Sequence, residues 1–138
     1  MPGDVPTTST TVVLPAVPAS AAAARRQVSA QVEDAEAAET VALLVSELVT
    51  VALVEGELTP QDTITIHTDP LDHGLRVTVC DTAMEAEATM AGHGAVEVHR
   101  HGGPGGLGLK IVARLARRWG VTSSHPGTRA WFEVDGLR

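Results

Sequence analysis

The segment from Gly103 to Val121 carries a residue pattern with recognisable chemistry. A run of glycines opens directly into an amphipathic helical pattern, and Lys110 lies in the expected first turn of that helix. Glycines let a backbone approach an anion closely, and the first N–H groups of a helix have no partners inside the helix. The pattern therefore indicates a phosphate site, with an ordinary flexible loop as the alternative.

The spacing of Gly105, Gly106 and Gly108 does not match the standard phosphate-binding motifs. A P-loop requires GxxxxGK[ST], and a dinucleotide-binding fingerprint requires a strand directly before the glycines. The glycines alone therefore do not decide between the two interpretations, and the rest of the chain has to do so.

Composition limits the class of protein. A chain of 138 residues with 43% hydrophobic content suits one domain with a real core. The formal charge of −7 gives no overall support for a nucleic-acid partner. The single cysteine, Cys80, cannot form an internal disulfide, which fits a reducing compartment, and we expect it to be a small buried hydrophobic residue.

No targeting or membrane segment is expected. We find no span with the roughly 20 apolar residues that a membrane helix needs. The apolar stretch from Val12 to Ala24 contains two prolines and its arginines follow it, whereas a signal peptide carries its positive charge first. We therefore expect a soluble, cytoplasmic protein.

Hydrophobic periodicity predicts the elements that would position the glycines. Residues 1–11 are rich in Pro, Thr, Ser and Gly and predict a flexible leader before one domain at 12–138. Alternating and helical patterns predict the following order: a possible edge strand at 10–14, a helix at 20–33 with Ser20 as N-cap, a helix at 40–54, a hairpin of strands 61–68 and 75–80, a helix at 109–119, and closing strands at 121–123 and 129–134.

This order predicts an α+β fold, a two-layer sandwich in which three helices cover one face of a mostly antiparallel sheet. The long irregular stretch from Ala83 to Gly106 leads into the glycines. Loops of that length are usually functional or disordered, so this stretch is a candidate lid.

Three motifs in this order resemble a known family. They are LLVSELVTVALVEG at 43–56, LRVTVCDTA at 75–83, and GGLGLKIVARLARRWGV with the terminal RAWFEV. From about Leu14 onward the chain resembles the ATP-binding domain shared by anti-sigma-factor serine kinases, sensor histidine kinases, DNA gyrase and heat-shock chaperones. The small stand-alone anti-sigma-kinase form is the most similar. The resemblance implies a Bergerat-type ATP-binding fold.

The resemblance implies a catalytic role for Glu47 and exposes a departure at Val51. The family motif reads Glu-Leu-Val-Thr-Asn-Ala, in which the glutamate serves as base or orients water and the asparagine ligates Mg²⁺. Here Glu47 is present, but Val51 stands where the asparagine should be. A valine offers Mg²⁺ no oxygen, so Mg²⁺ binding is doubtful and we expect impaired catalysis. Glu55 could offer another metal oxygen or could simply be a solvated helix end.

The same resemblance implies a nucleotide site for ATP or ADP. Asp81 takes the place of the aspartate that accepts a hydrogen bond from the adenine amino group, with a surface turn as its alternative role. Gly106, Gly108 and Leu109 match the glycine motif, and Lys110 could supply phosphate-neutralising charge because Leu107 stands where an arginine is common. The contact made by a threonine in the last strand stays unassigned between Thr128 and Arg129.

Two other groups of residues have ordinary explanations. His93, His99 and His101 fall together in the candidate lid, but their spacing does not match a zinc template, so we expect no metal site there. Trp119, at the end of a predicted helix, and Trp131, in a predicted strand, favour core packing over ligand stacking.

Three functions are compatible with these residues. The first is an active protein serine/threonine kinase of a partner-switching pathway. The second, which Val51 favours, is a regulatory ATP-binding protein of the anti-sigma-factor kinase type with impaired catalysis. The third is a nucleotide-independent protein-binding module. The expected partner is a protein such as a sigma factor or an anti-sigma antagonist, and a homodimer through an exposed edge near Val12 is possible by analogy.

Overall fold

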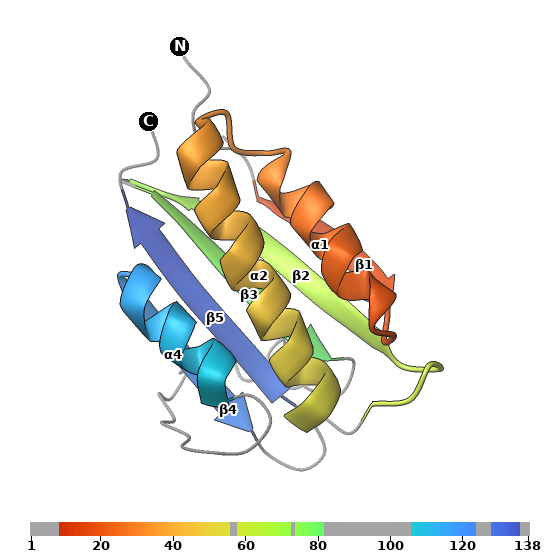
Figure 1. The fold of residues 1–138 in the computed structure, drawn as a ribbon. Coiled ribbons are helices and arrows are strands. Elements are labelled where there is room, and N and C mark those ends of the chain that lie inside the picture. The colour runs from red at the N-terminus through yellow and green to blue at the C-terminus, as the bar shows by residue number, and fades with distance from the viewer. Residues whose placement is uncertain (1–8, 56–57, 73, 82–105, 124–127, 136–138) are drawn as a thin grey trace.

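The computed structural model describes residues 9–55, 58–72, 74–81, 106–123 and 128–135 (Figure 1). The elements are β1 (Thr10–Pro15), α1 (Ala19–Ser29), α2 (Ala35–Glu55), β2 (Thr63–Leu71), β3 (Gly74–Asp81), α4 (Gly106–Leu115), β4 (Arg118–Ser123) and β5 (Thr128–Asp135). The candidate lid, apart from Gly106, lies outside the described residues, as do the three histidines within it.

The five strands form one antiparallel sheet in the order β1-β2-β3-β5-β4. Helices α1, α2 and α4 lie side by side over one face of this sheet (Figure 1). The prediction of an α+β two-layer sandwich is therefore confirmed. The expected edge strand near Val12 is confirmed too, because β1 pairs only with β2 within the described sheet.

The core lies between the helices and the sheet. Strand alternation sends Val77 and Val79 of β3 and Phe132 of β5 into it, where each is fully buried. Leu44 and Leu48 of α2 belong to the same buried cluster. Helix α2 occupies the centre of the helical layer and contacts α1, α4, β3 and β5. Its burial holds the whole layer against the sheet.

The central position of α2 explains why it is so apolar. Ala35–Val54 comprises 20 residues with a mean hydropathy of 1.9, which is long and apolar enough to cross a membrane by length and composition. The expectation that no such span exists was therefore wrong. In this structure 44% of that window is buried inside the protein, and the core helix of a globular domain passes the same test.

The first two helices have different ends from those predicted. Helix α1 ends at Ser29. Helix α2 begins at Ala35, because Asp34 Oδ2 accepts a hydrogen bond from the Ala37 N–H at 2.8 Å. This cap starts α2 well before its strongly apolar residues. Ser20 is not an N-cap, because Pro18 holds that position and Ser20 Oγ donates to the Pro15 carbonyl at 2.6 Å.

The last helix is also displaced from its predicted range of 109–119. Helix α4 begins at Gly106 and ends at Leu115, and the chain enters β4 at Arg118. The Arg117 N–H donates to the Glu133 carbonyl at 2.7 Å, which directs the backbone into the sheet. Trp119 therefore lies in a strand opposite Phe132, although it packs against the core as expected.

Trp131 is buried on the sheet face that the helices do not cover. Its side chain is 3% exposed, and the Arg76 guanidinium carbon lies 4.3 Å from the ring centroid. Arg118 lies 5.6 Å from the same centroid. The Glu133 carboxylate lies 3.7 Å from Arg76 Nη1 and 3.5 Å from Arg118 Nη1. The two arginines and the carboxylate thus enclose the ring, so Trp131 has a packing role outside the main core.

Gly120 is expected to be essential for this arrangement. It lies opposite Trp131, and a Cβ at Gly120 would come within 2.7 Å of Trp131 Nε1. We expect Gly120→Ala to lower the free energy of unfolding by about 1–3 kcal/mol, measured by urea denaturation. In a Trp131→Leu background the same substitution should cost less, because the clashing ring is gone. An equal cost in both backgrounds would contradict this explanation.

Candidate functional site

Three elements come together at one end of the sandwich: the C-terminal half of α2, the end of β3 and the start of α4 (Figure 1). Helix α2 contacts both other elements. Glu47 and Val51 lie on α2, Asp81 is the last residue of β3, and Gly106 is the first residue of α4. The elements that carry the predicted site residues are therefore gathered at one place, although they are far apart in sequence.

Asp81 is held at the end of β3 in nearly complete burial. Its exposed fraction is 1%, and it pairs in register with Ile64 of β2. The alternation of β3 places Asp81 in phase with Val77 and Val79, on the face that the helices cover. The oxygens of a carboxyl group can accept a hydrogen bond from an N–H donor. This geometry suits hydrogen bonding to an exocyclic amino group.

Val51 is part of the hydrophobic core. Its side chain is 1% exposed, and it belongs to the same buried cluster as its neighbours Leu48 and Ala52. Mg²⁺ takes oxygen ligands in near-octahedral geometry, and an isopropyl group supplies none. The nearby Thr50 hydroxyl donates to the Ser46 carbonyl at 3.0 Å, back along the helix. Val51 therefore leaves the expected Mg²⁺-ligand position without an oxygen.

Glu47 lies one helical turn before Val51 and is half-buried. A residue four positions earlier on a helix lies on the same face, so Glu47 and Val51 are directed to the same side of α2. Among the described residues no group of three or more histidine, cysteine, aspartate or glutamate side chains could hold a metal ion. A carboxylate is thus present for proton transfer, but the described residues provide no metal cluster around it.

The start of α4 supplies backbone donors that have no partner within the helix. Because the helix begins at Gly106, its first N–H groups come from the glycine motif itself, including Gly108 and Leu109. Lys110 is exposed in the following turn, and no acidic residue lies in the first turn. A helix N-terminus with a nearby lysine favours a negatively charged group by both its dipole and its charge.

The sheet register separates Thr128 from Arg129, the two positions left open for the threonine contact in the last strand. Arg129 lies opposite Cys80 in the pairing of β3 with β5. Strand alternation puts Arg129 in phase with Trp131 and Glu133, on the face away from the helices. Arg129 is thus excluded from the helix-covered end, and position 128 has the backbone phase of the core residue Ala130. The apolar alternation of 130, 132 and 134 was the signal that could have decided this.

The comparison with known families agrees with this arrangement. The family model for the histidine kinase-like ATPase domain matches residues 14–133, which include all three helices and the positions of Glu47, Val51, Asp81 and the α4 glycines. No curated protein matches the chain significantly. Because the family match covers most of the chain, the protein belongs to the histidine kinase-like ATPase domain family, and this membership implies that it binds a nucleotide.

Proposed function

We propose that the protein is a regulatory ATP-binding protein of the anti-sigma-factor kinase type whose phosphoryl-transfer activity is impaired. The observation that carries this proposal is the buried hydrocarbon side chain of Val51 at the expected Mg²⁺-ligand position. Asp81 and the glycine-initiated helix are retained at the same end of the domain. Features suited to nucleotide recognition are thus retained while a group needed for metal binding is lost.

The described residues are suited to binding a nucleotide in the absence of Mg²⁺. The Asp81 carboxylate would accept the adenine amino N–H, which favours adenine over guanine. The N–H groups at the start of α4 and the Lys110 ammonium would hold the phosphates. ADP offers the same adenine and one phosphate fewer, so it suits these groups as well.

The described residues are suited to the nucleotide but not to Mg²⁺, because Val51 offers the ion no oxygen ligand. In phosphoryl transfer the ion neutralises charge on the phosphates, so its loss removes a large part of the catalytic stabilisation. Glu47 remains as a possible base, but positioning a base does not replace that neutralisation. We therefore assign the protein a binding role rather than efficient turnover.

A regulatory role implies a protein partner, and we propose one such as a sigma factor or an anti-sigma antagonist in the cytoplasm. A homodimer is a further possibility at the edge strand β1, where Val13 is 59% exposed. A strand edge presents free backbone donors and acceptors that a second strand can pair with.

Calorimetric titration with ATP and ADP tests this proposal. Each nucleotide is titrated in Mg²⁺ and again with a chelator, and we expect similar affinity in both conditions. A γ-phosphate transfer assay with a cognate antagonist should show little turnover. Tight binding only with Mg²⁺, together with ordinary turnover, would instead establish an active kinase. Absence of heat and of any change in melting temperature would favour the nucleotide-independent protein-binding module.

A further inference from the structure

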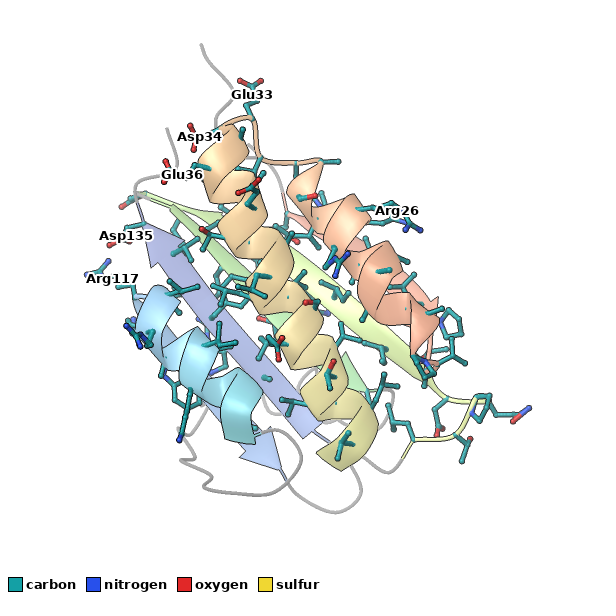
Figure 2. The ribbon with its side chains drawn as sticks, viewed as in Figure 1. Arg26, Glu33, Asp34, Glu36, Arg117 and Asp135 are labelled. Atoms are coloured by element: carbon teal, nitrogen blue, oxygen red, sulfur yellow. The ribbon has the colours of Figure 1, made fainter. Side chains whose placement is uncertain are left out.

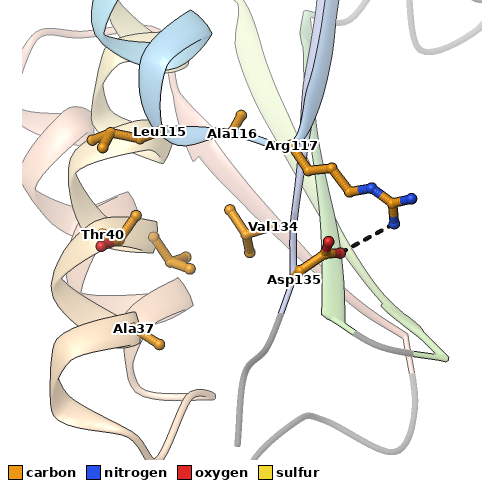
Figure 3. A pocket seen from close by; sticks show the side chains of 8 residues that line it. Ala37, Thr40, Leu115, Ala116, Arg117, Val134 and Asp135 are labelled. Carbon is orange, nitrogen blue, oxygen red and sulfur yellow. Dashed lines mark hydrogen bonds and ion pairs between the residues drawn. The ribbon is translucent and has the colours of Figure 1, made fainter.

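A pocket lies at the opposite end of the helical layer from the elements that carry Asp81 and the α4 glycines. It is a pocket of about 290 Å³ between the first turns of α2, the end of α4 and the end of β5 (Figure 3). Ala37 and Val41 line it from α2, Leu115 from α4 and Val134 from β5. Helices α2 and α4 contribute to both ends with different residues, α2 with its first and last turns and α4 with its end and its start.

The floor of this pocket and part of its walls are apolar. Val41 and Val134 are core residues with exposed fractions of 0% and 5%, so the pocket floor is the surface of the core itself. Leu115 forms one wall and is 47% exposed, so this wall is accessible to an incoming apolar side chain. The small side chain of Ala37 leaves the space unfilled.

The size of the pocket limits what it can hold. Sites for small molecules usually have volumes of about 300–1,000 Å³ and enclose most of the ligand. A pocket at the lower limit of this range, and open on one side, suits one inserted side chain better than a cofactor. Side-chain anchors of this kind are typical of peptide recognition.

Carboxylates gather at the end of the molecule where the pocket lies, beside the pocket-lining turn of α2 that carries Ala37 and Thr40. Glu33, Asp34 and Glu36 lie at the start of α2, at the same end of the molecule as Asp135 (Figure 2). Among the described residues that line the pocket, Arg117 is the basic one, and its Nη1 lies 3.2 Å from Asp135 Oδ1. Arg114, in the last turn of α4, adds one more cation beside Leu115, so the three carboxylates at the start of α2 outnumber it. An approaching cationic group would be favoured.

We propose that this pocket docks a basic linear segment of a partner protein. One aliphatic side chain of the segment inserts between Ala37, Leu115 and Val134. Flanking lysine or arginine side chains face Glu33 and Glu36. The inference rests on the proposed function only in requiring a protein partner, and it specifies the chemistry of that partner. Because the pocket lies away from Asp81, docking and nucleotide binding use separate surfaces.

The test uses fluorescein-labelled hexapeptides and fluorescence anisotropy. The probe is Lys-Arg-Leu-Leu-Arg-Lys, with Lys-Arg-Gly-Gly-Arg-Lys and Glu-Glu-Leu-Leu-Glu-Glu as matched controls. We expect only the first to bind measurably, and its affinity should fall as salt is raised. Equal binding of the glycine peptide would mean that charge alone acts, and equal binding of the acidic peptide would exclude the proposed complementarity. Either result, or no binding of the first peptide, would overturn the proposal.

Two alanine-to-leucine variants locate the binding site. Ala37→Leu fills the pocket and should weaken binding of the basic peptide at least tenfold. Ala113→Leu adds the same atoms at an exposed position of α4 that does not line the pocket, and it should leave binding unchanged. Circular dichroism melts confirm that both variants fold, and ATP titration separates this test from that of the proposed function. Equal peptide binding by the two variants would place the site elsewhere.

A third variant distinguishes a partner from the chain's own tail. Residues 136–138, Gly-Leu-Arg, directly follow Asp135 and also combine an aliphatic with a basic side chain. A variant without them should bind the probe peptide with unchanged affinity. If the peptide bound only after their removal, the occupant would be this tail, and the partner proposal would be wrong.

Discussion

Replacing Asp81 with asparagine is expected to weaken ATP binding by about 10- to 100-fold. A hydrogen bond to a charged group contributes about 1.5–3 kcal/mol, and each 1.4 kcal/mol corresponds to a factor of ten in affinity. Asp81 is 1% exposed at the end of β3, so water cannot substitute freely for the lost charge. The neutral amide also presents its own N–H donors, which match the amino group of adenine poorly.

The measurement is calorimetric titration of the native protein and of Asp81→Asn with ATP and with GTP. The native protein should prefer ATP, and the variant should lose most of that preference. Asp72→Asn is the matched control, because Asp72 is exposed and lies outside β3, at the opposite end of that strand from Asp81. Melting temperatures report whether the buried substitution disturbs the fold. Unchanged ATP affinity and base preference in a folded Asp81→Asn protein would show that Asp81 does not recognise adenine.

The strand that leads to Asp81 could be predicted from the sequence because Val77 and Val79 alternate with polar residues. The alternation alone left a surface turn open for Asp81, and its proposed role came from the family resemblance, whereas the structure includes Asp81 in β3 and buries it. The hairpin of β2 and β3 was predicted for the same reason, although β2 continues beyond the predicted Thr68 to Leu71. Local periodicity was sufficient to locate a strand wherever one face of that strand is buried and the other is polar.

The residues at which helices begin and end depend on capping and tertiary interactions. The hydrophobic periodicity of the sequence does not reveal these interactions. The beginning of α2 follows from the Asp34 cap, and before Val41 the helix carries alanines but no large apolar residue. The end of α4 follows from the backbone bond of Arg117 to a residue of β5, a contact between segments separated in sequence. Helical propensity would have continued α4 through Arg117, and tertiary pairing stopped it.

The pocket and the buried Trp131 could not be predicted for a related reason. The pocket exists because Ala37 of α2 and Leu115 of α4 meet at the end of β5, and only the packed layer brings them together. The burial of Trp131 depends on Arg76 from a neighbouring strand. The sequence indicated that Trp131 belongs to an alternating strand. It did not indicate on which face of the sheet the side chain lies or which residues cover it there.

The substitution Val51→Asn is expected to make ATP binding dependent on Mg²⁺. The amide oxygen would provide the ligand that valine lacks, and we expect at least tenfold tighter ATP binding with Mg²⁺ than with a chelator. Without ATP and Mg²⁺ the variant should be less stable by about 1–3 kcal/mol, because a polar group then replaces a side chain that is 1% exposed. The metal-bound nucleotide should recover part of that loss.

Val51→Ala is the control that separates the new oxygen from the altered packing. Alanine also removes buried hydrocarbon and lowers stability, but it offers no ligand, so its ATP affinity should not respond to Mg²⁺. The comparison uses calorimetry and melting temperatures of both variants with and without the metal. If Val51→Asn folded and bound ATP equally in Mg²⁺ and in chelator, the loss of metal binding would have to involve further positions beyond Val51. If the expected dependence is found, one side chain on α2 separates a nucleotide-binding regulator from a site that can also hold the metal required for phosphoryl transfer.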